Sequence, residues 1–312
     1  MKPALLIPIF EPSDDVVPFL MTFQADEFSD FLVINDGSDP KFDVIYREIE
    51  EKTPFRVEGY PKNQGKGAAL KYGLKKLLER NPDLEGFITA DGDGQHAKDD
   101  ILALRDALEA NPDAMHLGVR DFNSPSVPKR SRFGNKFSCG YFQIATGVRL
   151  TDTQTGLRAI PMSIFPLFLS TGGERYEFEM NFLMLAARNI KIEQHGIQTI
   201  YEDDNAVSHF RPVRDAMRIY RTPILYGLVS VLSWVIDIGM FALLSSFAFT
   251  ETPEIQVFAS TAIARVLSGT FNFLSLAFVV FPKKGETLNK LWKYLVTFSL
   301  NLVLSGGLTY LF

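Results

Sequence analysis

The 312-residue sequence contains very little cysteine and no excess of positive charge. Cys139 is the single cysteine, so no disulfide can form within the chain, and a lone thiol fits a reducing compartment. The chain holds 32 basic and 37 acidic residues, a net charge of -5, which disfavours a general nucleic-acid binder. Hydrophobic residues make up 46% of the chain and charged residues 22%, which excludes a disordered or collagen-like protein.

Several signatures of catalysis and cofactor binding are also missing. The four histidines show no ligand spacing, so zinc is not indicated, and no serine lies in a G-x-S-x-G elbow. Residues 8–12, after the first apolar run, supply prolines instead of the glycines of a dinucleotide fingerprint. Residues 63–70 are glycine-rich, but Gly67 stands where a Walker loop needs Ser or Thr. Nicotinamide chemistry and covalent hydrolysis are therefore disfavoured.

The charge is unevenly distributed along the chain. From Thr222 to Phe312 there are five basic and four acidic residues, whereas the first 221 residues hold 27 basic and 33 acidic ones. The C-terminal part consists almost wholly of apolar runs. The sequence therefore predicts a water-soluble α/β domain at 1–221 and a membrane domain at 222–312.

Three apolar stretches, at about 224–249, 255–281 and 291–312, are long enough to cross a bilayer as helices. Basic residues precede the first stretch and separate the second from the third, whereas the break around Pro253 is acidic. Because basic flanks stay in the cytoplasm, we expect a multi-pass protein of the cell membrane with residues 1–221 on the cytoplasmic side. The N-terminus does not resemble a signal peptide, in agreement with this orientation.

Two charged residues lie inside these stretches, Asp237 in the first and Arg265 in the second. Each costs about 2.5–3.5 kcal/mol at the bilayer centre, so we expect both to face protein and to pair with each other. A structural ion pair is the plainer interpretation, and a role in lipid or substrate passage is the alternative. Three buried helices of a soluble protein are a further alternative, but no polar residues recur along the stretches with helical period.

Short apolar runs alternate with helical patterns over the first 120 residues, which predicts βα units around a mainly parallel sheet. The expected strands lie at 4–9, 31–34, 55–57, 86–90 and 115–119. Polar residues follow the second and fourth of these strands, at 35–39 and 91–96. Because ligands of such sheets bind beyond the carboxyl ends of the strands, we expect a binding site there.

Asp91 and Asp93 lie two residues apart at the end of an expected strand. In a turn, both carboxylates can converge on a hard cation such as Mg²⁺ or Mn²⁺, which binds through oxygen ligands together with substrate phosphates. Gln95 continues the same spacing and offers an amide oxygen. An acidic Asp-Gly turn without an ion is the alternative.

The glycine-rich segment 63–70 is expected to join a strand to a helix and contains Lys66. Exposed amides at the start of a helix favour an anion such as a diphosphate.

Basic and aromatic residues cluster beyond Arg120. The basic members open a segment with apolar residues at helical spacing: Lys129, Arg130, Arg132, Phe133, Phe137, Tyr141 and Ile144. The apolar stripe suits a membrane surface, and packing in the core is an equally good explanation. Segments 151–158 and 174–179 are dense in polar residues, for which solvated or structural roles are the plainer interpretation.

Five motifs occur in a fixed order along the chain: IPIFEP at 7–12, VINDGSD at 33–39, NQGKGAAL at 63–70, TADGDGQH at 89–96 and DTQTGLR at 152–158. Over about residues 3–215 the chain resembles the family 2 glycosyltransferases, and most closely the branch of dolichyl-phosphate mannose synthase and bacterial polyprenyl-phosphate glycosyltransferases. The C-terminal part, with RVLSGTFNF at 265–273, looks like the GtrA-like membrane domain. That domain typically has four spans, and three are counted here, so we expect it to be incomplete.

The resemblance implies a Rossmann-like GT-A fold followed by an all-α transmembrane domain, and it assigns roles to residues. For the donor, it implies Asp36 at the base or ribose, Asp91, Asp93 and Gln95 on the metal, and Pro8 and Lys66 as further binding residues. For the acceptor phosphate it implies Arg120, Arg132 and, less directly, Ser138, with Arg211 adding positive charge near the phosphates. Asp152, Gln154 and Arg158 would line the sugar end.

These roles imply an inverting glycosyltransferase that moves a hexose from a UDP- or GDP-hexose to a polyisoprenyl phosphate, dolichyl or undecaprenyl, at the cytoplasmic membrane face. The acceptor phosphate is already anionic near neutral pH, so no general base is needed. The expected partners are this donor, this acceptor and the lipid bilayer, but not nucleic acid, and a homo-oligomer stays open. The alternative function is translocation of a lipid-linked sugar by the membrane domain, with the soluble domain as scaffold or sensor. The chain lacks the Q-x-x-R-W motif of processive members, which disfavours polysaccharide synthesis.

Overall fold

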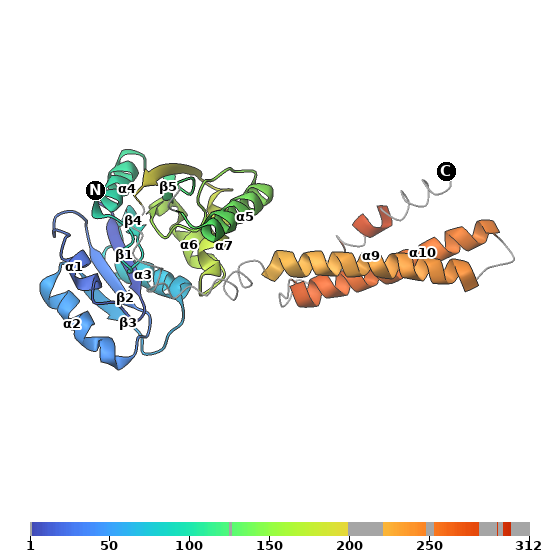
Figure 1. Cartoon of the computed structure of the whole chain (residues 1–312), viewed down its shortest axis with the longest axis horizontal. Helices are drawn as coiled ribbons and strands as arrows, with labels where there is room; N and C mark the ends of the chain where they lie inside the picture. The colour runs from blue at the N-terminus through green and yellow to red at the C-terminus, as the bar shows by residue number, and fades with distance from the viewer. Residues whose placement is uncertain are drawn as a thin grey trace. The chain divides into compact units, whose positions relative to one another are not determined.

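The computed structural model describes residues 2–124, 127–198, 221–247, 253–280, 292 and 296–300. The chain divides into two compact units, 1–215 and 216–312. In the first unit, a seven-stranded sheet has the order β3-β2-β1-β4-β6-β5-β7 (Figure 1). Its strands are β1 (Ala4–Ile9), β2 (Phe31–Asn35), β3 (Arg56–Gly59), β4 (Gly86–Thr89), β5 (Ala114–Arg120), β6 (Arg158–Pro161) and β7 (Lys191–Ile197).

The sheet is mainly parallel, as predicted. β1 runs parallel to β2 and β4, β2 to β3, and β5 to β7, whereas β6 runs antiparallel to both β4 and β5. The strands expected from the sequence are all present: 4–9 matches β1, and the ends of the others differ by at most two residues. β6 and β7 were not expected. The reversal of β6 places the segment that precedes it at the carboxyl edge of the parallel strands.

Helices cover both faces of the sheet. On one face, α1 (Val16–Leu20), α2 (Asp43–Lys52) and α4 (Lys98–Ala110) pack on a core that includes Leu5, Ile7 and Ile9 of β1. On the other lie α3 (Lys66–Arg80), α6 (Phe165–Ser170) and α7 (Glu177–Ala186), and Gly73 of α3 meets Leu6. The alternation follows from the two-residue period of a strand. The remaining elements of this unit are η1 (Pro40–Phe42), α5 (Lys129–Thr146) and η2 (Met162–Ile164).

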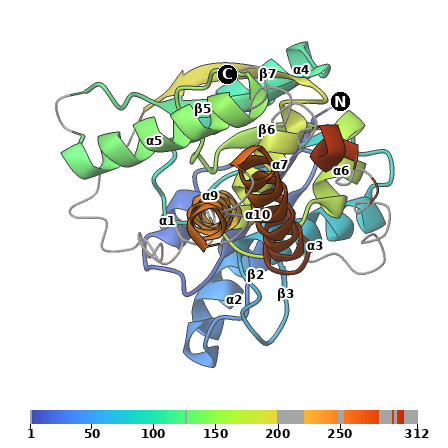
Figure 2. The ribbon, with the colours of Figure 1, turned by 90° about the vertical axis from the view of Figure 1, so that its right-hand side faces the viewer.

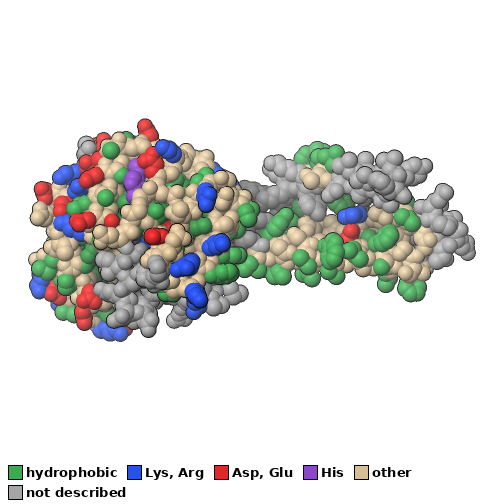
Figure 3. Space-filling view, turned by 45° about the horizontal axis from the view of Figure 1, so that its top comes forward, with side chains coloured by type: hydrophobic (Ala, Val, Ile, Leu, Met, Phe, Trp, Pro, Cys, Tyr) green, Lys and Arg blue, Asp and Glu red, His purple; other side chains and the backbone are tan. Residues whose placement is uncertain are grey.

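The described part of the second unit is helical. α9 (Arg221–Phe247) and α10 (Pro253–Ser275), which continues into the π-helical turn η4 (Leu276–Val280), lie side by side (Figures 1 and 2). Ile224–Phe247 and Gln256–Val280 are long and apolar enough to cross a membrane. Hydrophobic side chains cover much of their surface (Figure 3), among them Trp234, which is 63% exposed. The third expected span, 291–312, lies mostly outside the described residues.

The two charges within these helices pair with each other, as predicted. Arg265 Nη1 lies 3.2 Å from Asp237 Oδ2, and the Ser268 hydroxyl donates a hydrogen bond of 2.9 Å to Asp237 Oδ1. The partners come from both helices, so the ion pair joins α9 to α10. This contact supports the structural interpretation of the two residues.

Candidate active site

Asp36, directly after β2, organises the glycine-rich turn before α3. Its buried carboxylate accepts hydrogen bonds from the Tyr60 hydroxyl (2.6 Å) and from the backbone N–H groups of Gln64 and Gly65 (3.0 Å each). Gly65 has a φ of 106°, which favours glycine. Asp36 therefore shapes the turn that presents the N-terminus of α3, and its contact with a donor base stays a prediction.

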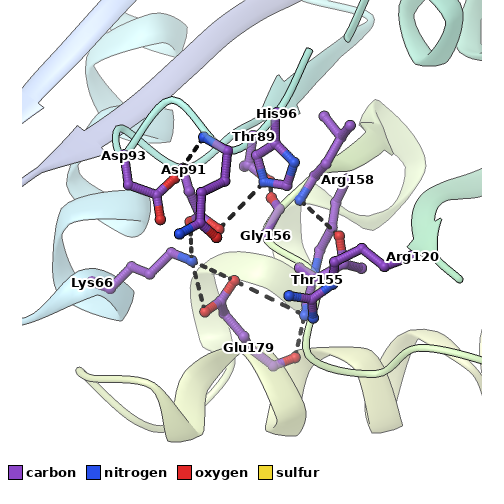
Figure 4. Close-up of polar contacts among 12 residues, drawn as sticks. Lys66, Thr89, Asp91, Asp93, His96, Arg120, Thr155, Gly156, Arg158 and Glu179 are labelled. Atoms are coloured by element: carbon purple, nitrogen blue, oxygen red, sulfur yellow. Dashed lines mark hydrogen bonds and ion pairs between the residues drawn. The ribbon is translucent and has the colours of Figure 1, made fainter. Parts of the chain in front are cut away.

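Lys66, the first residue of α3, lies between two carboxylates (Figure 4). Its Nζ is 2.5 Å from Asp91 Oδ1 and 2.9 Å from Glu179 Oε2 of α7. Burial opposes ionisation of Lys66, but its pKa is raised because both acids stabilise the ammonium. Glu179 belongs to a segment, 174–179, for which solvated or structural roles were the plainer interpretation of the sequence. Its contact with Lys66 forms only when α7 packs beside the start of α3.

Asp91 and Asp93 differ in their electrostatic surroundings. Burial raises the pKa of Asp91, but Lys66 and then His96, whose Nε2 is 3.4 Å from Asp91 Oδ2, outweigh it and hold the pKa below its usual range. The pKa of Asp93 is raised, first by burial and then by the charge of Asp91. A cation beside Asp93 would remove this penalty. The Gln95 side chain lies in the same turn, and its backbone N–H donates to Asp93 Oδ1 at 3.1 Å.

The segment before β6 meets these acids because β6 is reversed. Thr89 of β4 donates a hydrogen bond of 2.8 Å to the carbonyl oxygen of Gly156. A Cβ atom at Gly156 would overlap the Asp91 carboxylate, so only glycine allows this approach. Arg158, fully buried, donates from Nη1 to the carbonyl oxygen of Glu179 at 2.8 Å. Burial lowers the pKa of Arg158 despite the nearby acids.

Arg120, at the end of β5, forms a two-point ion pair with Asp152. Its Nε lies 2.7 Å from Asp152 Oδ2 and its Nη2 lies 3.2 Å from Oδ1. The Asp152 side chain is completely buried, so Arg120 compensates its charge. Ser138 of α5 binds the same segment through the Thr153 hydroxyl, at 2.6 Å. Arg120, Asp152 and Ser138 thus form one connected group.

The other predicted site residues lie at the margins of this arrangement. Pro8 lies within β1, Gln154 is exposed, and Arg132, in the first turn of α5, donates from Nη2 to the carbonyl oxygen of Ser124 at 3.0 Å. Arg211 lies outside the described residues. The structure thus brings Lys66, Asp91, Asp93 and Arg158 around one carboxyl edge, with Arg120 beside them (Figure 4). Arg120 forms its ion pair with Asp152 there.

The apolar stripe of α5 faces outwards. Phe133 is 73% exposed, Phe137 56% and Ile144 89%. Core packing is therefore wrong for these three side chains, and contact with a membrane surface stays a prediction. Cys139 of the same helix has a raised pKa, through burial and then Asp152, so its thiol stays protonated and lacks the character of a nucleophile.

Two histidines that are far apart in the sequence lie together in space, beside Glu193. His116 and His195 are 79 residues apart in the sequence, yet their ring nitrogens Nδ1 and Nε2 lie 3.0 Å apart, with Glu193 beside them. Sequence spacing misses the cluster because parallel pairing of β5 with β7 creates it. No strand was expected from the sequence at 191–197; with β7 assigned there, Glu193 and His195, two residues apart, lie on one face of the strand.

Two family models match the chain. Residues 23–165 match Glycosyl transferase family 2, and residues 225–312 match the GtrA/DPMS transmembrane domain. The UDP-N-acetylglucosamine--dolichyl-phosphate N-acetylglucosaminyltransferase of Methanococcus voltae is 26% identical over 217 residues, covering 64% of this chain and 86% of that relative.

Solved structures are similar at lower identity. Mannosyl-3-phosphoglycerate synthase from Rubrobacter xylanophilus is 14% identical with a TM-score of 0.49, covering 77% of this chain and 75% of that one. Glucosyl-3-phosphoglycerate synthase from Mycobacterium tuberculosis, in complex with Mn²⁺, UDP and phosphoglyceric acid, is also 14% identical with a TM-score of 0.49, covering 72% and 76%.

The family matches agree with the layered α/β sheet of the first unit and the apolar helices of the second. The expected GT-A-like fold is confirmed, and the two matched segments occur in the order that the motifs predicted. The chain thus carries a segment that matches the family 2 glycosyltransferases, residues 23–165, followed by a segment that matches the GtrA/DPMS transmembrane domain, residues 225–312.

Proposed function

We propose that this protein is an inverting glycosyltransferase that moves one hexose from a nucleotide-diphosphate sugar to a polyisoprenyl phosphate at the cytoplasmic membrane face. The observation that carries the proposal is the arrangement of Asp91 and Asp93 at the carboxyl edge of the sheet, beside Lys66 and the N-terminus of α3. Acidic and basic groups in contact at such an edge suit a diphosphate that binds together with a cation.

The carboxylates fit Mg²⁺ or Mn²⁺. They offer oxygen ligands, and Gln95 lies in the same turn. Burial and then the charge of Asp91 raise the pKa of Asp93, and a bound cation would oppose both effects. Two protein carboxylates, completed by water and substrate phosphates, are a usual ligand set for these hard ions. When bound, such an ion offsets the charge on the departing nucleoside diphosphate. We assign Asp91 and Asp93 as ligands and Gln95 as a third.

Lys66 is suited to a role that changes on donor binding. In the structure, Lys66 compensates the charge of Asp91. When Asp91 binds a cation, the Lys66 ammonium would stay paired with Glu179. A lysine held this way at the start of a helix can also reach a phosphate oxygen. We therefore assign Lys66 to the donor diphosphate and Glu179 to the positioning of Lys66.

The acceptor side rests on Arg120, Arg132 and the exposed stripe of α5. The two guanidinium groups supply positive charge for a phosphate, and the Asp152 pair holds Arg120 in place. Phe133 and Phe137, exposed on the helix that carries Arg132, suit a lipid chain or a bilayer surface. The relative from Methanococcus voltae has dolichyl phosphate as acceptor by its name, which supports a polyisoprenyl phosphate here.

No general base is needed for this reaction. The acceptor oxygen is anionic near neutral pH and attacks the anomeric carbon opposite the leaving diphosphate, which inverts the configuration. The protein then contributes position and charge compensation. Among the proposed groups, Lys66 binds the donor phosphates and Arg120 and Arg132 orient the acceptor.

The proposal is tested by transfer of labelled sugar into an organic-soluble lipid. Full-length protein would receive polyprenyl phosphate, Mn²⁺ and, in separate reactions, UDP-glucose, UDP-N-acetylglucosamine or GDP-mannose; the relative's name makes UDP-N-acetylglucosamine the necessary comparison for a hexose donor. We expect product with one donor, at least about a 100-fold loss in Asp93→Asn, and unchanged transfer in the control Asp99→Asn, whose side chain is exposed on α4. Equal rates in both variants would contradict the proposal.

Translocation by the membrane domain receives no added support from the described helices. Asp237, which motivated that alternative, is compensated by Arg265 and Ser268. The pair therefore has a structural explanation.

A further inference from the structure

A cluster of nitrogen and oxygen ligands lies between β5 and β7, at the β7 edge of the sheet. His116 lies on β5 and is fully buried, whereas Glu193 and His195 lie on the neighbouring strand β7 and are half-buried. The parallel register places His116 opposite Glu193 and Gly118 opposite His195. Side chains two residues apart on β7 share one face, so both reach towards His116. Asp91 and Asp93, in contrast, follow β4.

The hydrogen bonds of His116 leave one ring nitrogen available as a ligand. Its Nε2 lies 2.9 Å from the carbonyl oxygen of Asn111, which can only accept, so Nε2 carries the proton and donates it. In the neutral ring, Nδ1 then carries the lone pair and faces His195 Nε2, 3.0 Å away. A backbone carbonyl that fixes the tautomer of a histidine in this way is typical of metal sites.

The two carboxylate oxygens of Glu193 have different neighbours. Oε1 accepts hydrogen bonds from Lys191 Nζ at 2.7 Å and from Asn111 Nδ2 at 3.2 Å. Oε2 faces the histidines, 3.7 Å from His116 Nδ1. One oxygen is thus anchored, while the other is directed at the two rings.

The spacing of these atoms suits a tetrahedral ion. Zinc bonds of about 2.0–2.1 Å to nitrogen and oxygen at tetrahedral angles place neighbouring ligand atoms about 3.3–3.4 Å apart. Two of the pairs here are 3.0 and 3.7 Å apart, and all three ligand atoms lie within 4.8 Å of one another. Small side-chain adjustments would therefore complete three bonds, with water as the fourth ligand.

We propose that His116, Glu193 and His195 form a zinc site that ties the edge strand β7 to β5. Two imidazoles and one carboxylate prefer zinc over the hard ions expected at Asp91 and Asp93. On binding, the proton on His195 Nε2 moves to its Nδ1, so that both facing nitrogens are ligands. Because β5 ends at Arg120, the ion also stabilises the strand that presents this residue to the candidate active site.

Zinc binding to the full-length protein tests the proposal. The protein would be stripped of metal with a chelator, exchanged into excess Mg²⁺ to occupy oxygen ligands, and titrated calorimetrically with Zn²⁺. Variants His195→Ala and the conservative Glu193→Gln would be compared with Gln198→Ala, an exposed residue just beyond β7. Co²⁺ would serve as a spectroscopic probe, because four-coordinate Co²⁺ absorbs strongly in the visible.

We expect one strongly bound Zn²⁺ per chain in the wild type and in Gln198→Ala, and at least about tenfold weaker binding in each ligand variant. Zn²⁺ should raise the melting temperature of the first two proteins but not of His195→Ala. The four-coordinate Co²⁺ spectrum should disappear with His195. Equal Zn²⁺ affinity in the wild type and both ligand variants, or no rise in wild-type melting temperature, would overturn the site and leave a hydrogen-bonded histidine pair.

Discussion

At the scale of single residues, the candidate active site is a set of buried charges that compensate one another. Lys66 touches two acids, Asp91 touches a lysine and a histidine, and Arg158 lies beside Glu179. Asp93 is the member whose pKa is raised. Perturbed groups of this kind concentrate at functional sites, which is why Asp93 is the most informative position to vary.

Glu179→Gln tests whether Glu179 positions Lys66. Without the second carboxylate, Lys66 should bind Asp91 alone and compete more strongly with the cation, so we expect the Mn²⁺ concentration for half-maximal transfer to rise about tenfold, with little change in kcat. The measurement is the Mn²⁺ dependence of transfer, with the exposed Glu109→Gln as control. A fall in kcat with an unchanged Mn²⁺ requirement would count against this role.

The raised pKa of Asp93 predicts a metal-dependent acid limb in the pH profile. Protonated Asp93 cannot serve as a ligand, so kcat/KM for the donor should fall as the pH drops towards its pKa. A bound cation favours the ionised form, and more Mn²⁺ should therefore move the limb to lower pH. Profiles measured at a low and a saturating Mn²⁺ concentration check this, and a limb that stays fixed would contradict it.

At the scale of elements, the antiparallel strand β6 brings the segment before it to the carboxyl ends of the parallel strands. The strands of the βα units could be predicted because each combines an apolar run with a polar break, as at Ala4–Ile9 and Phe31–Asn35. The reversed strand could not, because residues 158–161 are too few to show a period and their pairing depends on β4 and β5. Glu179 and the His116–His195 contact were missed for the same physical reason, since only tertiary pairing brings them to their partners.

Gly156→Ala tests the close approach of the segment before β6 to Asp91. The added Cβ would overlap the Asp91 carboxylate, and overpacking typically costs about 1–3 kcal/mol. We expect a lower melting temperature and at least about a tenfold fall in kcat/KM for the donor, because the carboxylate must move. Gly140→Ala is the matched control, since a Cβ there meets nothing within 4 Å. Full activity in Gly156→Ala would show that Asp91 is not held where the structure places it.

At the scale of the whole molecule, the chain combines two domains. The sheet domain contains the charged residues of the candidate site, and the helices of the second domain expose apolar side chains. The sequence alone predicts this division, because the charged residues are concentrated before residue 222. It also predicts the pairing of Asp237 with Arg265, since single charges within apolar stretches require partners. A membrane anchor suits a lipid-bound acceptor, because it keeps the proposed reaction beside the bilayer.

Arg265→Leu tests the ion pair between α9 and α10. An uncompensated aspartate in a membrane helix costs about 2.5–3.5 kcal/mol on insertion scales, so the melting temperature in detergent should fall. The double variant Asp237→Leu/Arg265→Leu should recover most of the lost melting temperature. The control Val266→Leu, at an exposed position of the same helix, should leave the melting temperature almost unchanged. If the double variant is less stable than the single one, the pair has more than a structural role.

Nucleoside diphosphate binding tests the central claim, that Asp91 and Asp93 hold the donor diphosphate through a divalent cation. Calorimetry would compare UDP and GDP binding to the wild type, Asp93→Asn and Asp99→Asn, each with Mn²⁺ and with chelator. We expect one of the two nucleotides to bind the wild type and Asp99→Asn only with Mn²⁺, and to bind Asp93→Asn at least about tenfold more weakly. Equal binding to Asp93→Asn, or undiminished wild-type binding in chelator, would contradict the account.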